Sequence, residues 1–123
     1  MVKWLLGSKW IVNIIKRQII KLAWRELDKG QILLRSAWKT GGKLKVNQVF
    51  DEIQVKIIHY AVGLPFTPDW LDRKMAEVVQ SQGDVFQKEL NRLIERNSDQ
   101  ALDLIDEMVD QYQKLLEQRI LAW

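Results

Sequence analysis

The chain lacks cysteine entirely and has a single histidine, His59, among its 123 residues. Without cysteine it has no disulfides, no thiolate nucleophile and no thiolate ligands for zinc. A lone histidine without a neighbouring catalytic partner is more often structural or surface-lying than functional. The usual nucleophile–base pairs and metal-ligand sets are therefore missing from one chain. We expect no enzymatic activity, no metal site and no bound cofactor.

Turn-forming residues are also scarce, with six glycines and two prolines. This scarcity favours a few long elements, and the 47% hydrophobic content argues against general disorder. The longest charge-free run is 57–68, whereas a membrane-spanning helix needs about 20 apolar residues. No signal peptide is recognisable at the N-terminus. These features predict a chain that is cytoplasmic or held within an assembled particle.

Apolar residues recur at intervals of three and four over most of the chain, which predicts an all-α fold. Glycine and proline punctuation divides this pattern into a small multi-helix bundle of about five helices. The helices are expected to be interrupted at Gly30, at Gly41 and Gly42, at Gly63 and at Gly83. The paired glycines are the strongest hinge candidate.

The last predicted helix, which begins near Ser98, is the most regular and is coiled-coil-like. Its apolar stripe consists of Leu102, Ile105, Val109, Tyr112, Leu116 and Ile120. Such a stripe is most often an intramolecular core, and we also consider it as a self-association seam. The opposite face carries Asp99, Asp103, Asp106 and Asp110, which indicate a solvated surface more than a cation site.

The net charge of +3 conceals an uneven distribution. Residues 1–50 carry a net charge of +9, and residues 51–123 carry −6. Such a split predicts either an anionic partner for the basic half or pairing between the two halves. We divide the chain accordingly into a basic, Trp-rich helical segment, 1–42, and an acidic helical bundle, 43–123, within one structural unit.

A helical wheel of residues 9–28 predicts two apolar faces. One is an ordinary core face, formed by Ile11, Val12, Ile15, Ile19, Leu22 and Ala23. The opposite side places further large apolar groups among lysines and arginines: Trp10, Ile14, Ile20 and Trp24. We predict that a partner binds there, on a set of six residues: Trp10, Ile14, Arg17, Lys21, Trp24 and Arg25.

Three classes of partner suit tryptophans that alternate with cations. A protein comes first, because tryptophan and arginine are enriched at binding hot spots. The chain would then be a non-catalytic structural or assembly subunit, such as a viral or phage particle component. A membrane surface comes second, with residues 1–28 as an interfacial helix, and nucleic acid comes third. The remaining alternative is a helix buried on both sides within its own fold.

Overall fold

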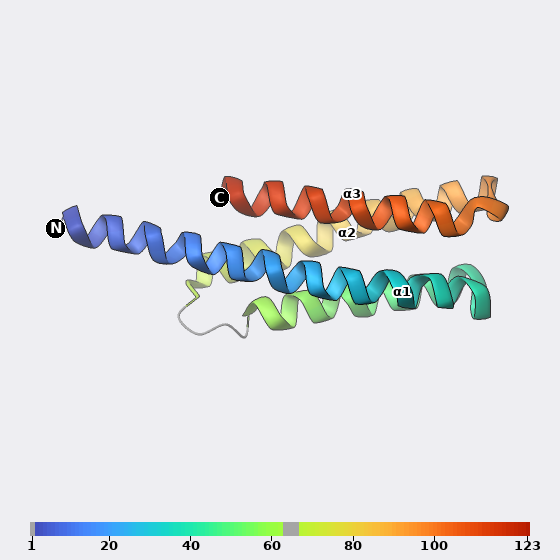
Figure 1. Ribbon diagram of the computed structural model, residues 1–123, viewed down its shortest axis with the longest axis horizontal. Coiled ribbons are helices and arrows are strands. Elements are labelled where there is room, and N and C mark those ends of the chain that lie inside the picture. Colours follow the sequence, from blue (N-terminus) through green and yellow to red (C-terminus); the bar gives the residue numbers. More distant parts are fainter. Residues whose placement is uncertain (1, 63–66) are drawn as a thin grey trace.

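A computed structural model describes the backbone of residues 2–62 and 67–123, and the side chains of residues 9–61 and 67–123. Its elements are α1 (Val2–Val62), α2 (Asp69–Arg96), the short 3-10 helix η1 (Ser98–Gln100) and α3 (Ala101–Ala122). The predicted all-α class is confirmed (Figure 1). The predicted number of about five helices is wrong, because the described residues form three α-helices.

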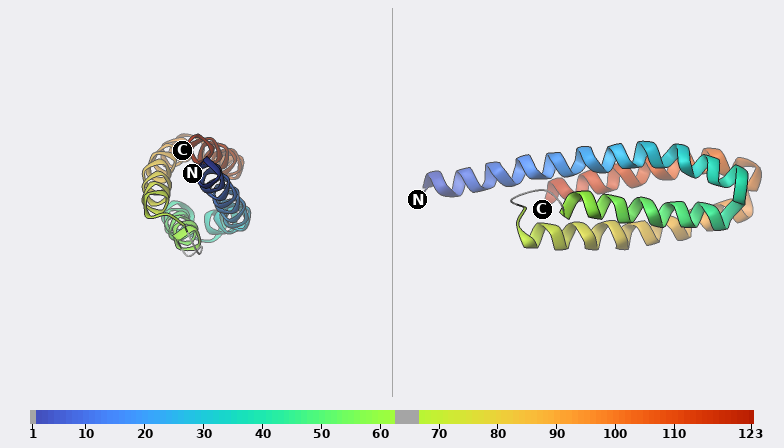
Figure 2. Two further views of the ribbon diagram at one scale, coloured as in Figure 1. Left: turned by 90° about the vertical axis from the view of Figure 1, so that its left-hand side faces the viewer. Right: turned by 90° about the horizontal axis from the view of Figure 1, so that it is seen from below.

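Helix α1 folds back on itself at Gly42, which leaves the helical region with φ 67° and ψ −153°. Glycine alone adopts this conformation readily, because a β-carbon would crowd the backbone there. We call residues 2–41 the first arm and residues 43–62 the second arm. The two arms, α2 and α3 lie side by side as a bundle of four helical rods (Figure 2). The predicted interruption at Gly42 is confirmed.

The interruptions predicted at Gly30 and Gly83 are wrong, since α1 and α2 continue through both residues. Both glycines are buried where two helices approach closely. A β-carbon at Gly83 would lie 2.5 Å from Cδ of Gln54, and one at Gly30 would overlap the side chain of Ile53. Glycine serves helix packing at these positions, which accounts for the smaller number of helices. The interruption predicted at Gly63 lies outside the described residues.

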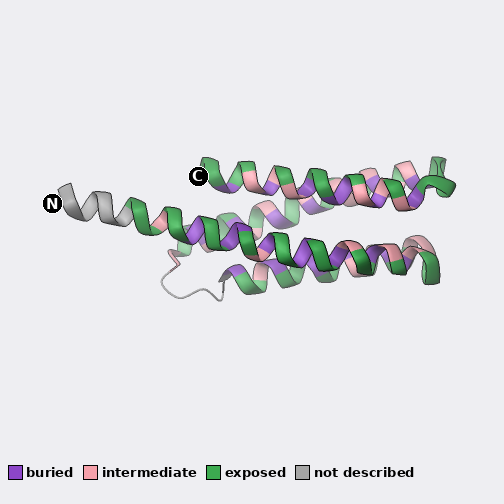
Figure 3. Ribbon diagram, in the orientation of Figure 1, coloured by how far each residue is buried: buried purple, intermediate pink, exposed green. Residues whose placement is uncertain are grey.

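A single hydrophobic core runs between the four rods (Figure 3). Buried residues of the first arm, such as Leu27 and Leu34, belong to the same core as buried residues of α2 and α3. The predicted boundary between 1–42 and 43–123 falls at the reversal of α1. Both segments contribute to the one core.

The apolar stripe of α3 faces into this core. Five of its members are buried: Ile105, Val109, Tyr112, Leu116 and Ile120. The sixth, Leu102, keeps partial exposure. Because these side chains fill the interior of their own chain, they are not available to a second copy in this fold. The self-association predicted through this stripe is therefore corrected to an intramolecular role.

Tyr112 joins α3 to α2 in the middle of the core. Its hydroxyl donates a hydrogen bond of 2.7 Å to the carbonyl oxygen of Val79. Its ring centroid lies 5.4 Å from that of Phe86 and 5.7 Å from that of Phe50. Burial raises the pKa of the Tyr112 hydroxyl, and the nearby carboxylate of Asp84 adds to the increase.

The substitution Gly42→Ala is expected to lower the free energy of unfolding by about 1–3 kcal/mol, because alanine is strained at this φ and ψ. Thr40→Ala is the matched control, since Thr40 is exposed and helical two residues away. Urea denaturation of both variants measures the difference. Equal stability of the two variants would contradict the assigned reversal.

The substitution Tyr112→Phe is expected to cost about 1 kcal/mol at neutral pH, the usual net value of a buried hydrogen bond. Folding raises the pKa of the hydroxyl above its ordinary value of 10.0, so the unfolded chain loses this proton first. The free energy of unfolding therefore falls as pH rises past that value. Urea denaturation at pH 7 and pH 11 should show a smaller fall in the variant than in the wild type. An identical fall in both would contradict the raised pKa.

Candidate docking surface

The six residues predicted to bind a partner lie on the outer face of the first arm. All of them are exposed: Trp10, Ile14, Arg17, Lys21, Trp24 and Arg25. We call these six residues the cationic tryptophan face. The exposed fraction is 67% for Trp10, 40% for Ile14 and 41% for Trp24. Large apolar groups gathered on a surface in this way are typical of interaction sites.

The opposite side of the first arm packs into the bundle and fixes the outward direction of the cationic tryptophan face. Its buried residues include Ile15, Ile19, Ala23 and Leu27. Neighbouring turns alternate between core and surface in Figure 3. The exposure of Trp10, Ile14 and Trp24 excludes the alternative of a helix buried on both sides within its own fold.

Two residues of the wheel lie on the side opposite to the one predicted. Ile20 was expected to face outward and is 8% exposed, whereas Ile11 was expected in the core and is 50% exposed. Neighbouring rods flank the first arm, so its buried arc is wide enough to include Ile20. Ile11 lies near the N-terminal stretch of α1, which extends past the end of α3 and has fewer neighbours (Figure 1).

Lys16 marks the place where the first arm passes the end of α3. It is 4% exposed, and its Nζ donates a hydrogen bond to the backbone carbonyl oxygen of Trp123. A cation is favourable at the C-terminal end of a helix, where unpaired carbonyls carry partial negative charge. The sequence analysis missed this contact. The available signal was a lysine that lies next to Ala23 on the wheel, at the edge of the predicted core face.

Basic residues near the reversal of α1 pair with acidic residues of the other helices. Arg35 Nη1 lies 2.5 Å from Oδ2 of Asp106 in α3, and Lys43 pairs with Glu95 in α2. By contrast, no ion pair within the described part of the chain involves the cations of the cationic tryptophan face. Some of the basic residues of the N-terminal half are thus neutralised by acidic residues of α2 and α3. The cations of the cationic tryptophan face remain to attract an anionic partner.

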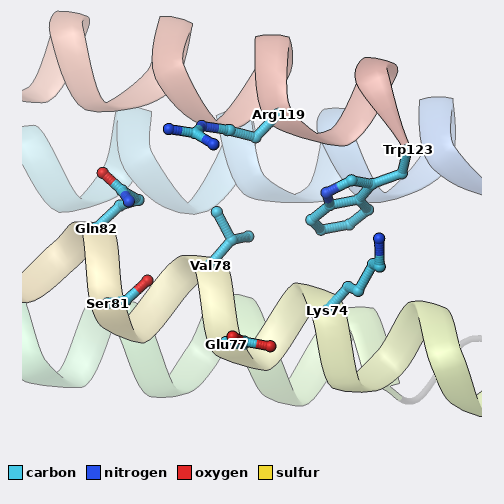
Figure 4. A pocket seen from close by; sticks show the side chains of 7 residues that line it. All are labelled: Lys74, Glu77, Val78, Ser81, Gln82, Arg119 and Trp123. Carbon is cyan, nitrogen blue, oxygen red and sulfur yellow. The ribbon is translucent and has the colours of Figure 1, made fainter.

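The hollow between α2 and α3 is lined by polar, charged and apolar side chains from both helices. The hollow in Figure 4 lies between α2 and α3 and has a volume of about 350 Å³. It is lined by Lys74, Glu77, Val78, Ser81, Gln82, Arg119 and Trp123. The indole of Trp123 lies in the gap between the helices, and Lys74 points toward it. No hydrogen bond between Ser81 and a base occurs among the described contacts, so the hydroxyl has no activating partner there.

A second hollow, of about 430 Å³, lies at the end of the bundle where the first arm passes Trp123. It is lined by Lys9, Val12, Asn13, Lys16, Trp70 and Trp123. Trp70 is 41% exposed there, although the periodicity of its helix predicts an inward side chain. This hollow adds two lysines and two further tryptophans to the region beside the cationic tryptophan face.

Within residues 9–61 and 67–123, no group of three or more histidine, cysteine, aspartate or glutamate side chains is arranged to hold a metal ion. Nor does any helix, as far as it is described, offer a stretch that is both long and apolar enough to cross a membrane. His59 is exposed, and its ring stands edge-on to that of Tyr60 with centroids 5.8 Å apart.

Comparisons of the chain with protein families, with curated proteins and with solved structures give no match.

Neighbouring isoleucines of the first arm provide a direct test of which face is free. Ile15→Ser is expected to lower the free energy of unfolding by at least about 2 kcal/mol, because Ile15 is 8% exposed. Ile14→Ser is expected to cost less than about 1 kcal/mol, because Ile14 is already 40% exposed. Thermal or urea denaturation compares the two variants. A larger loss for Ile14→Ser would mean that the faces are assigned the wrong way round.

Proposed function

We propose that this chain is a non-catalytic structural subunit that docks into a larger protein assembly through the cationic tryptophan face. The observation that carries the proposal is the exposure of Trp10, Ile14 and Trp24 on a helix whose other side already fills the core. With exposed fractions of 67% for Trp10 and 41% for Trp24, the two indoles together offer about the surface of one whole tryptophan, about 150–250 Å². A standard interface buries about 800 Å² on each side, so two indoles supply a substantial share of it.

A protein partner suits this pattern better than a lipid surface does. A helix that lies in a membrane interface presents one continuous apolar face. On the first arm, that face is occupied by the core, and the outer tryptophans are separated by Arg17 and Lys21. Protein interfaces, in contrast, commonly set arginine beside aromatic anchors within one patch.

A peripheral membrane role is the second candidate, and one observation favours it. Trp10 and Trp70 are both exposed, and Trp70 shares a hollow with Lys9 and Trp123 at the end of the bundle where the N-terminus lies (Figure 1). Tryptophans gather at membrane interfaces, and cations there meet anionic lipid. Flotation with vesicles would support this role if the chain bound anionic vesicles, and absent binding to both neutral and anionic vesicles would remove it.

Photo-crosslinking in cells that naturally make the chain tests the docking proposal. A p-benzoylphenylalanine placed at position 14 is expected to form a discrete covalent adduct with a protein, because that position lies within the interface. Position 55 is the matched control, since Val55 is 66% exposed on the second arm, outside the proposed surface. Adducts at position 55 with none at position 14 would contradict the proposal.

A further inference from the structure

The second charged surface of the molecule is an acidic one on η1 and the first half of α3. Asp99, Asp103 and Glu107 are exposed there, and no described ion pair involves any of the three. The neighbouring carboxylates differ, because Asp106 pairs with Arg35 and Asp110 pairs with a lysine one turn further along. We call Asp99, Asp103 and Glu107 the acidic triplet.

The acidic triplet matches the cations of the cationic tryptophan face in spacing and opposes them in sign. Arg17, Lys21 and Arg25 follow one another at intervals of four residues, as do the three acids. Each set spans eight residues, which is about 12 Å along an α-helix, and the acidic set begins in η1, where the rise per residue is larger. Two helices laid side by side would therefore bring the three cations close to the three carboxylates.

The two sets cannot meet within one molecule. The cations begin at Arg17, next to Lys16, which contacts Trp123 at the C-terminal end of α3. The acids lie at the opposite end, where α3 begins. The first arm and α3 are neighbouring rods, as Arg35 and Asp106 demonstrate. Both sets therefore stay exposed and without a described ion pair in the single chain, at opposite ends of adjacent helices, and Glu107 accepts a hydrogen bond only from Gln111, one turn further along α3.

We infer that the partner of the cationic tryptophan face is a second copy of this chain, which presents its acidic triplet. This inference rests on the docking function proposed above and names its occupant. A two-fold axis that passes midway between the two sets relates the two copies. It places the acids of each copy opposite the cations of the other. The contact then occurs twice, as is usual for a self-complementary dimer. Trp24 and Ile14, which flank the cations, would supply the apolar part of the interface.

Charge exchange between two variants tests the inference. One variant carries Arg17→Glu, Lys21→Glu and Arg25→Glu, and the other carries Asp99→Lys, Asp103→Lys and Glu107→Lys. The wild type is expected to sediment as a dimer at low salt and to dissociate as salt increases. Each variant alone should weaken dimerisation at least about a hundredfold, because like charges now face each other. An equimolar mixture should restore the dimer, because each contact again joins opposite charges.

Several outcomes would overturn the inference. These are a wild type that stays monomeric at high micromolar concentration and low salt, a dimer that tolerates both sets of substitutions, or a mixture that does not associate. A monomer that floats with anionic vesicles would put a lipid surface in place of the second copy. Restored association in the mixture also shows that both variants are folded. A monomeric chain that still forms adducts from position 14 would overturn the second-copy inference and leave the docking function standing.

Discussion

The reversal of α1 at Gly42 is the constraint on which the rest of the bundle depends. One residue with φ 67° turns a helix of 61 residues back on itself and sets its two arms side by side (Figure 2). The second arm then supplies the side chains of Ile53 and Gln54, against which Gly30 and Gly83 pack. Because the first arm packs against both the second arm and α3, the side of the first arm that faces the solvent is fixed. The position of the cationic tryptophan face follows from that packing.

Local periodicity was sufficient to predict the class of fold, and the paired glycines predicted the hinge at Gly42. Neither was sufficient to count the helices. Gly30 and Gly83 are single glycines within an otherwise helical pattern, and only Gly42 is set apart in the sequence, by its pairing with Gly41. At Gly42 the residue turns the chain, whereas at Gly30 and Gly83 it admits a side chain from another helix. These two roles differ only in what lies opposite the glycine in space. A single sequence does not contain that information.

The helical wheel predicted the position of the cationic tryptophan face. It did not predict where the buried side of the first arm ends. Trp10, Ile14 and Trp24 lie outside the core arc of any regular helix through residues 9–28, so a wheel alone places them correctly. Ile20 and Ile11 lie near the edges of that arc, where burial depends on how far neighbouring rods extend. The hydrogen bond between Lys16 and Trp123 depends on how α3 packs along α1, which the sequence of α1 does not contain. Whether the α3 stripe faces its own core or a second copy likewise depends on the packing of all the helices.

On the proposed function, a partner covers the outer face of the first arm in the working form of the protein. Hydroxyl-radical footprinting of the dilute and the associated chain measures this cover, because Trp24 and Trp70 are equally exposed, at 41% each, in the single chain. Both should be oxidised to a similar extent in the dilute chain. On association, oxidation of Trp10 and Trp24 should fall while that of Trp70 stays unchanged. Protection of Trp70 with continued oxidation of Trp24 would contradict the account.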